Sequence, residues 1–471
     1  MKLYLHKTVF AALLLLFFAG CKMGKNYQRP ELALPKQFDA AASGDTSSVA
    51  DLEWKAFFTD PGLQQLIDKG LHYNNDLLAG LKRMEMAQQQ AKQSKLLQLP
   101  ELGLAVSGQI SRPSGNSLTG ISIKNFLGRS YLENYSASIP LSWEADIWGK
   151  IRRQKEIALT DYLRSTEAAK AIRTRLVSDI SLGYFNLLML DRQLQIARMN
   201  LALSDSFVVA SRLIKNAGLV TMLAVEQAES QRQSVALLIP QLEQQVAIQE
   251  NALQLLTGQL PSSLPRQTEL SSISFRDNFS TGVPMAMVSR RPDVRASELA
   301  LISANARVGV AQAAMYPTLN ITAGAGLESF QASNWFSIPG SLFGLATGAI
   351  AQPIFKRRAL RTQFEVAKLQ REEAVIQFRQ SVLVASTEVA NALVQAEKLN
   401  QQQQIAKGQV DTLQLAVSHA QLLFKSDMAT YLEVITAQGN ALQAELNLVF
   451  IRRQQLSARV ELYRSLGGGW K

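Results

Sequence analysis

Tyr316-Pro317-Thr318-Leu319-Asn320-Ile321 opens a stretch of alternating apolar and polar residues, and Leu99-Pro100-Glu101-Leu102 opens a similar stretch in the first half of the chain. Each is followed by a second alternating segment, one ending at Asp146-Ile147-Trp148 and one at Pro353-Ile354-Phe355. A period of two indicates β-strands. The sequence therefore predicts two strand pairs, whose members lie at about 100–112, 135–148, 317–329 and 342–355.

A long helical hairpin is predicted after each strand pair. Arg152–Asn216 contains no proline, and a helix of that length would extend roughly 100 Å at 1.5 Å per residue. Arg361–Phe424 has the same character, and the helical pattern breaks near residues 218 and 428. A leucine spacing of seven in the first helix is typical of a helix packed along another helix. Each half thus resembles a repeat unit that has to pack against further copies to bury its apolar faces.

These patterns divide the chain into six segments. Pro240 lies inside the first returning helix, where it predicts a kink or a local break. The glycine- and serine-rich residues 111–130 are predicted to form a loop. The segments are a signal peptide at 1–20, an extended linker at 21–52, a first repeat at 53–265, a connector at 266–282, a second repeat at 283–466 and a tail at 467–471.

The N-terminal residues resemble a lipoprotein signal. Lys2 and Lys7 flank the start, and Thr8–Phe18 is apolar but too short to span a bilayer. Ala19-Gly20-Cys21 follows, as in the lipobox of bacterial lipoproteins. We expect cleavage before Cys21 and acylation of this residue. The alternative is an ordinary secretory signal followed by a chance cysteine. Cys21 is the single cysteine, so it has no disulfide partner within the chain.

The predicted strands have one apolar and one polar face. Ala137, Ile139 and Leu141 alternate with Ser136, Ser138 and Ser142. Such segments of about 10 residues are typical of membrane barrels, although a soluble sheet with one wet face has the same pattern. Four strands cannot close a barrel, because the smallest have about eight strands. If the sheet lies in a membrane, several chains must combine their strands.

Composition argues against catalysis and nucleic-acid binding. Charged residues make up 18% of the chain, and the net charge of +11 is spread along it without a nucleic-acid-binding motif. Three histidines and one cysteine leave little for metal or nucleophilic chemistry. Glu144 and Asp146 share one strand face, where they are better explained as pore lining than as an acid–base pair. We therefore expect no enzyme activity and no cofactor.

Two further motifs have structural and functional interpretations. In Arg290-Arg291-Pro292-Asp293-Val294, proline suits the first position of a helix and aspartate its first turn. Glu433 lies just inside the second helical turn, where copies around an axis would form a carboxylate ring that attracts cations. A solvated surface glutamate is the alternative. Met222 and Met428 near the two turns would suit soft metal ions, but apolar contact with a partner explains them better.

Together these residues resemble the TolC-like outer-membrane factor family, and more closely its OprM/NodT lipoprotein branch. The resemblance runs the whole length of the chain in order. The matching stretches are Asn26–Pro30, Pro140–Lys150, Arg290–Arg295, Tyr316–Ile321, Tyr431–Gln438 and Ser465–Trp470.

The resemblance implies a mainly α fold with β structure that works as a homotrimer. Three chains would share a twelve-stranded barrel in the outer membrane, with its lipid outside, and would form an α-helical tunnel in the periplasm. The segments around Trp54–Leu66 and Thr257–Phe279, the second of which overlaps the equatorial connector at 266–282, would form an equatorial collar. A periplasmic adaptor (membrane fusion) protein and an inner-membrane RND-type transporter would be the protein partners.

Specific residues carry over from the family. The adaptor-contact tips would be Gly218, Leu219, Val220 and Thr221 in the first half, with Met428, Ala429 and Thr430 in the second. Glu433 and Thr436 match the periplasmic gate positions, although the family commonly has aspartate where Thr436 lies. Ala224 likewise replaces an acidic residue near the first tip.

The expected function is an exit duct that passively conducts small molecules such as drugs out of the cell. A duct for type I secretion of a polypeptide remains an alternative, and a periplasmic coiled-coil adaptor is another. The sequence does not indicate the cargo.

Overall fold

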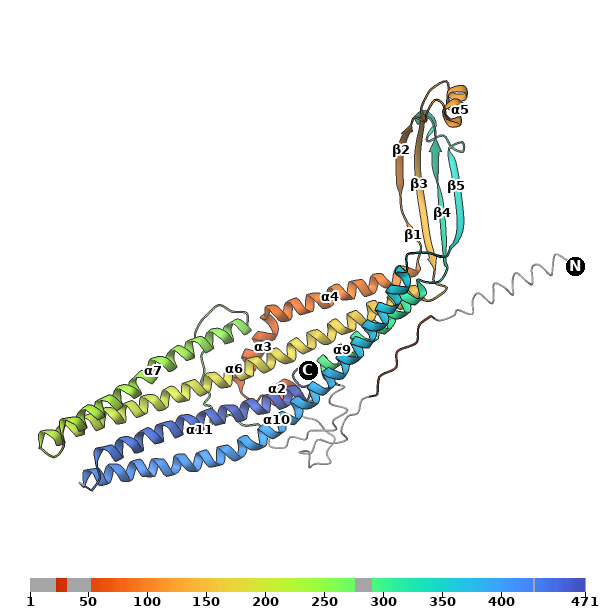
Figure 1. Cartoon of the computed structure of the whole chain (residues 1–471). Helices are drawn as coiled ribbons and strands as arrows, with labels where there is room; N and C mark the ends of the chain where they lie inside the picture. The colour runs from red at the N-terminus through yellow and green to blue at the C-terminus, as the bar shows by residue number, and fades with distance from the viewer. Residues whose placement is uncertain (1–22, 32–51, 276–289, 427, 471) are drawn as a thin grey trace. The chain divides into compact units, whose positions relative to one another are not determined.

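The computed structural model describes residues 23–31, 52–275, 290–426 and 428–470, and it separates into two compact units (Figure 1). Unit 1 combines Met1–Pro30, Met86–Leu163 and Leu299–Ile376. Unit 2 combines Glu31–Glu85, Arg164–Glu298 and Gln377–Lys471. Most described residues are helical and a smaller part forms one sheet, so the prediction of a mainly α fold with β structure is confirmed.

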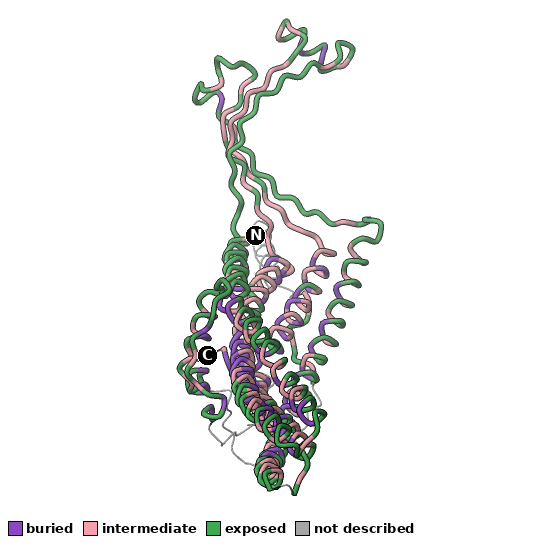
Figure 2. Tube along the Cα trace, turned by 90° about the vertical axis from the view of Figure 1, so that its left-hand side faces the viewer, coloured by how far each residue is buried: buried purple, intermediate pink, exposed green. Residues whose placement is uncertain are grey.

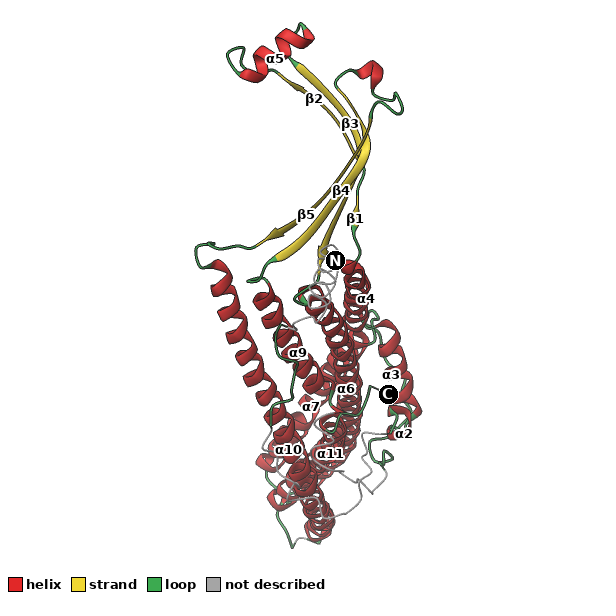
Figure 3. Ribbon diagram, turned by 90° about the vertical axis from the view of Figure 1, so that its right-hand side faces the viewer, coloured by secondary structure: helices red, strands yellow, loops and turns green. Residues whose placement is uncertain are grey.

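Unit 1 holds an antiparallel sheet in the order β1-β3-β4-β5, with β2 also paired to β3 (Figure 3). Both β1 and β2 pair antiparallel with β3. Only Gly103 and Leu104 separate β1 from β2, so the two form one interrupted strand. The continuous strand expected at about 100–112 is thus broken. The sheet has β1 and β2 along one edge and β5 along the other. The strand bounds are Glu101–Leu102, Ala105–Ser111, Leu132–Ala145, Thr318–Ser329 and Leu342–Ala351.

The strand register gathers apolar side chains on one face of the sheet. Val106 is paired with Ala137, which is paired with Leu327, which in turn is paired with Leu342. The opposite face carries rows such as Ser142, Thr322 and Thr347. Directly paired residues point to the same side of a sheet. The alternation read from the sequence therefore becomes two chemically distinct faces, although Leu345 of β5 falls on the polar one.

The residues between β2 and β3 contain a helix, α5 (Leu118–Leu127), where the sequence predicted only a loop. The side chain of Ser117 accepts a hydrogen bond from the backbone N–H of Gly120, and the helix ends at Gly128 with φ +66°. These are standard start and stop signals. In the sequence they were hidden among the glycines and serines of a short segment.

Four helices form two hairpins. α6 (Lys150–Asn216) and α10 (Ala359–Lys425) each contain 67 residues, and α7 (Met222–Leu256) and α11 (Tyr431–Ser465) each contain 35. Asp146 caps α6, because its carboxylate accepts from the N–H groups of Ile151 and Arg152 at 2.9 Å. The remaining helical segments of the described residues are α2 (Trp54–Phe57), α3 (Pro61–Tyr73), α4 (Asn75–Lys95), η2 (Leu96–Gln98), α9 (Pro292–Ala313) and η3 (Ala332–Asn334).

Pro240 does not break its helix. α7 continues from Met222 to Leu256 through this proline, so the predicted local break is absent, and a kink at this position stays a prediction. Proline removes one helical N–H donor and so frees a carbonyl one turn earlier. Pro240 is exposed, so water can satisfy that carbonyl and the cost is reduced.

An aromatic core holds the helices of unit 2 together. Phe57 of α2 stacks on Tyr463 of α11 with ring centroids 4.1 Å apart, and Phe275 lies 6.1 Å from Phe185 of α6. The core continues along the seven-residue spacing of α6, where Leu187 and Ala197 are fully buried. Figure 2 shows buried residues concentrated along the helices, whereas the strands are exposed or intermediate.

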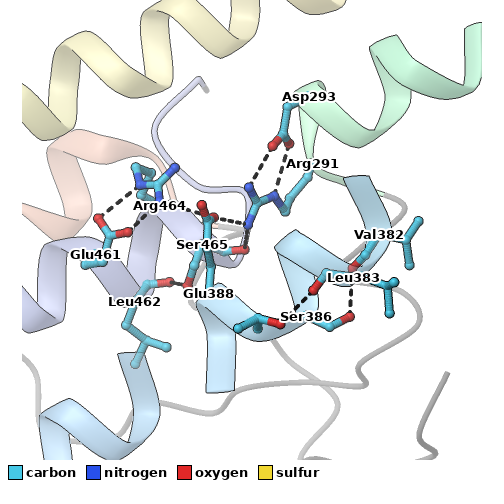
Figure 4. A network of polar contacts seen from close by, with 11 residues as sticks. Arg291, Asp293, Val382, Leu383, Ser386, Glu388, Glu461, Leu462, Arg464 and Ser465 are labelled. Atoms are coloured by element: carbon cyan, nitrogen blue, oxygen red, sulfur yellow. Dashed lines mark hydrogen bonds and ion pairs between the residues drawn. The ribbon is translucent and has the colours of Figure 1, made fainter. Parts of the chain in front are cut away.

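A polar network joins α9, α10 and α11 within unit 2 (Figure 4). Pro292 is the first residue of α9 and Asp293 lies in its first turn, as the sequence predicted. The nearly buried Arg291 donates to both carboxylate oxygens of Asp293 and pairs with Glu388 of α10 at 2.7 Å. Glu388 also pairs with Arg464 of α11 at 3.1 Å.

The same network shifts the pKa values of its members. Burial disfavours the charged form of Arg291, but hydrogen bonds from it to Asp293 and the charge of Glu388 outweigh this and raise its pKa. Burial would raise the pKa of Asp293, yet its bonds with Arg291 lower it below the usual range. Both groups therefore remain charged near neutral pH, which keeps the three helices connected.

No helix among the described residues combines the length and the apolar character needed to cross a bilayer.

Alkaline pH should weaken unit 2 through Tyr463. Its hydroxyl donates to the carbonyl of Leu52 at 2.8 Å, and burial raises its pKa from 10.0 to about 12. A raised pKa gives stability that is fully present below pH 10 and is lost as pH rises toward 12. Tyr463→Phe should cost about 1 kcal/mol at pH 7 for the lost hydrogen bond and should lose less stability between pH 10 and 12.

Urea midpoints in detergent at several pH values measure this effect, with the exposed Tyr73→Phe as the control. A Tyr463→Phe protein that loses as much stability as the unaltered protein over the alkaline interval would contradict the assignment.

Candidate functional site at the helical tips

The first tip is a helix-ending turn built around Gly218. The N–H of Gly218 donates to the carbonyl of Lys215, and the N–H of Leu219 donates to the carbonyl of Ile214. This bonding pattern is the Schellman motif, which requires a left-handed residue at its centre. Gly218 fills that place with φ +77°. A side chain with a Cβ would be strained there, so the turn depends on this glycine.

The second tip uses a similar closing bond. The N–H of Met428 donates to the carbonyl of Leu423 at 2.9 Å, with the same five-residue separation as Leu219 and Ile214. Thr221 and Thr430 precede the two returning helices with almost the same backbone, at φ −83°, ψ 166° and φ −85°, ψ 160°. The two tips are therefore closely similar in local geometry.

The tips differ in how the returning helix begins. In the second tip, the carboxylate of Glu433 accepts from the backbone N–H of Thr430 at 2.6 Å, forming a capping box. The corresponding residue after Thr221 is Ala224, which is fully buried and offers no acceptor. Glu433 thus holds the start of α11 and also carries a negative charge at the exposed surface, where the helix dipole favours it.

An apolar cluster joins the two hairpins just inside the tips. Phe207 of α6 lies 5.5 Å from Phe424 of α10, measured between ring centroids. Val208, Ala228 of α7 and Val434 of α11 complete the buried part of the cluster. The tips are therefore parts of one packed end of unit 2.

Apolar side chains remain exposed around this packed end. Leu219 is 71% exposed and Met428 is 70% exposed. Exposed apolar side chains gathered in one region are a common feature of contact surfaces. Other members of the patch are Leu213, Met222, Leu223, Leu422 and Leu432.

The structure locates the other predicted site residues without assigning them a role. Gly218, Leu219, Val220 and Thr221 form one turn, and Met428, Ala429 and Thr430 belong to the other. Thr436 is exposed three residues after Glu433 on α11. The described ranges contain no group of three or more His, Cys, Asp or Glu side chains placed to hold a metal ion. Cys21 lies outside the described residues.

Sequence reasoning missed a polar cluster between the hairpins. Glu445 of α11 accepts from Gln414 of α10 at 2.7 Å, and Asn200 of α6 lies within 3.5 Å of the same carboxylate. Gln438 is a buried residue of α11. Its side-chain nitrogen has no hydrogen-bond partner within the described parts of the chain. No local motif marks these residues, because their partners are far away in the sequence.

Removing the capping carboxylate should loosen the start of α11. Glu433→Ala leaves the N–H of Thr430 without its acceptor and should cost about 1 kcal/mol locally. We expect faster amide hydrogen exchange at the first turn of α11, while Glu433→Gln, which keeps an acceptor oxygen, should retain most protection. Unchanged exchange in Glu433→Ala would show that this cap contributes nothing.

Comparison with known proteins places the chain in a family. The family model for the outer membrane efflux protein matches residues 66–259 and 283–468. The cation efflux system protein CusC of Escherichia coli is 29% identical over 97% of both chains, and the solvent efflux pump outer membrane protein SrpC of Pseudomonas putida is 30% identical over 97% of both.

A solved structure agrees with this assignment. The MtrE outer membrane channel of Neisseria gonorrhoeae, crystallised in its open state, superimposes with a TM-score of 0.86 at 25% identity, covering 96% of this chain and 99% of that one. The sequence-based identification of the family is therefore confirmed. The chain belongs to the outer membrane efflux protein family.

Proposed function

We propose that this protein is the outer-membrane exit duct of a tripartite efflux pump and that three copies form one channel. It passively conducts small molecules delivered by an RND-type inner-membrane transporter through a periplasmic adaptor. The observation that carries the proposal is a sheet with one apolar face and two unpaired edges, joined in the same chain to two 67-residue helices.

The sheet edges explain why copies have to associate. Each unsatisfied backbone group in the hydrocarbon core costs several kcal/mol. Among the residues that the structure describes in one chain, β5 has no partner on one side, and β1 and β2 have none on the other. If β5 of one copy pairs with β1 and β2 of the next, every edge is satisfied. Three copies give twelve strands when β1 and β2 count as one, which is enough to close a barrel.

The two faces fit a closed barrel. Ile139, Leu141 and Leu327 lie on the face that would contact lipid. Ser142, Thr322 and Thr347 lie on the face that would line an aqueous lumen. Glu144 and Asn320 form a directly paired row on the same lumen face. The equal lengths of the paired helices and the two separate matches to the family model support an internal duplication.

We further propose that the tips form the periplasmic end of the channel. The exposed apolar patch around Leu219 and Met428 is suited to an adaptor's helical hairpin. Glu433 and Thr436 are the gate candidates. If copies of Glu433 face one another, their carboxylates would repel one another and would attract cations. The hydrogen bond from the N–H of Thr430 fixes each carboxylate at the start of α11. The cargo is set by the partner pump, since relatives of similar identity are named for cations and for solvents.

The N-terminal segment supplies a lipid anchor in this proposal. Acylation of Cys21 after removal of residues 1–20 would tether the chain, and residues 21–52 would link it to the folded part. We expect Cys21→Ala to abolish labelling with a palmitate analogue and to weaken retention in outer-membrane fractions. The barrel strands would still hold a fraction of the protein there. Undiminished lipid labelling in Cys21→Ala would exclude this residue as the attachment site.

Complementation tests the function. Deletion of the gene should increase susceptibility to small toxic compounds while leaving secreted polypeptides unchanged. Gly218→Asn should restore resistance because asparagine tolerates a positive φ, whereas Gly218→Val should restore little and should reduce crosslinking to the adaptor.

Three results would count against parts of this account. Loss of a secreted polypeptide without a change in susceptibility would favour type I secretion. Recovery of the protein only in soluble periplasmic fractions would favour a coiled-coil adaptor. Full crosslinking in Gly218→Val would remove the first tip from the adaptor contact.

A further inference from the structure

The helix α5 turns an apolar face outward in unit 1. At 100° per residue, Gly120, Ile123 and Leu127 share the inward side, and the first two are buried. The opposite side presents Leu118 and Phe126, which are 86% and 88% exposed, together with Ile121. The polar Ser122 and Asn125 lie among them on the same side. A helix that buries one face and shows three large apolar side chains on the other is suited to a second apolar environment.

The charges around α5 have a single sign. Residues 111–131 contain Arg112, Lys124 and Arg129 and no aspartate or glutamate. Arg129 is used within the unit, since it pairs with Glu133 and donates to the carbonyl of Phe330. Arg112 is exposed in the segment before α5, and Lys124 is exposed on the helix itself, three residues after Ile121. Cationic side chains that flank an apolar helix face are typical of helices lying at an anionic lipid surface.

Aromatic residues place this end of the sheet at a membrane boundary. Tyr135, on the apolar face of β3, lies 5.7 Å from Trp335 of the β4–β5 loop, which lies 4.9 Å from the exposed Phe336. Trp143 is on the same face of β3, eight residues further along. At about 3.3 Å per residue these positions are roughly 26 Å apart, close to the apolar band of a membrane barrel, which aromatic residues border at both ends.

The connection from α5 to this aromatic border is direct. Gly128 ends the helix, and the guanidinium of Arg129 reaches both the β4–β5 loop and the ring of Tyr131. Figure 3 shows α5 beyond the ends of β2 and β3. The end of α5 is therefore tied through Arg129 to the aromatic end of the sheet, where the lipid headgroups of a spanned membrane would lie.

We propose that α5 is a lipid-docking helix, whose Leu118, Ile121 and Phe126 insert among the headgroups of the outer leaflet while Arg112 and Lys124 bind lipid phosphates. The proposal rests on the proposed function, because it requires the sheet to span the outer membrane. Its ligand class is the phospholipid of net negative charge in the surrounding bilayer, as opposed to zwitterionic lipid. The helix would brace the rim of the barrel from the lipid side.

Fluorescence quenching in vesicles tests the docking. Phe126→Cys in a Cys21→Ala background carries one thiol, which is labelled with an environment-sensitive dye; Asn216→Cys, at the exposed end of α6, is the control. The protein is reconstituted in phosphatidylcholine vesicles containing phosphatidylglycerol and lipids with a nitroxide near the headgroup. We expect the dye at position 126 to be blue-shifted and quenched by the nitroxide lipid, and the dye at position 216 to be unaffected.

A charge variant separates lipid phosphates from apolar contact alone. The protein with both Arg112→Gln and Lys124→Gln should show less quenching of the dye at position 126 in the anionic vesicles. In vesicles of phosphatidylcholine alone, its quenching should equal that of the protein without these two substitutions. Equal quenching of both proteins in anionic vesicles would overturn the phosphate contacts.

Channel conductance in the same vesicles keeps the two proposals distinguishable. Conducting channels in which aqueous iodide, and not the lipid nitroxide, quenches position 126 would overturn the docking and leave the exit duct intact. Conducting channels whose Phe126→Cys thiols crosslink between copies would show that another copy covers α5, which also overturns it. Absence of conductance together with absence of membrane insertion would contradict the exit duct itself, and lipid docking with it.

Discussion

Unpaired backbone groups at the edges of a sheet have to find partners wherever water cannot reach them. In this protein the constraint applies to β1 and β2 on one edge and to β5 on the other. The strand register puts Ala137, Leu327 and Leu342 in one row. The sheet therefore has an apolar face, which is unfavourable in water, and edge strands whose backbone groups need hydrogen-bond partners. A single chain cannot meet both requirements. In the proposed channel, association of copies around an aqueous lumen would meet both requirements together.

The helical part meets a different requirement, which is rigidity over a long distance. Helices of 67 residues bury little of their surface against one neighbour, so they depend on cores distributed along their length. The aromatic core around Phe185 and Tyr463 and the cluster around Phe207 and Phe424 stabilise two separate levels of unit 2. Between α9, α10 and α11, the network of Arg291, Glu388 and Arg464 adds directional contacts. Burying an arginine costs free energy unless the arginine is paired. The network therefore favours the packing in which Arg291, before α9, lies next to Glu388 of α10.

Much of this architecture could be predicted from local periodicity. The alternation around Ile139 and Ile321 indicated strands, and the seven-residue spacing through Leu187 indicated a packed helix, because both signals are repeated many times. The start of α9 at Pro292 was predictable because proline and aspartate act within a single turn. The family was recognisable because its short motifs occur in order along the whole chain.

What the sequence did not reveal depends on contacts between distant residues or on short segments. α5 was missed because ten residues among glycines and serines give too weak a period. The break predicted at Pro240 is absent, since the cost of a proline within a helix depends on solvent access. The motif around Arg291 was expected to begin a helix at Pro292, but the pairing of Arg291 with Glu388 is a long-range contact that no local pattern reveals. Glu433 was read as a free carboxylate, and its bond to Thr430 appears only with the turn geometry.

Native mass spectrometry of the full-length protein, extracted from membranes in mild detergent, tests the central claim most directly. The closed circle of paired sheet edges predicts a single species containing three copies, which dissociates only when the detergent is replaced by a denaturant. A monodisperse single copy that remains folded in water without detergent would contradict the account.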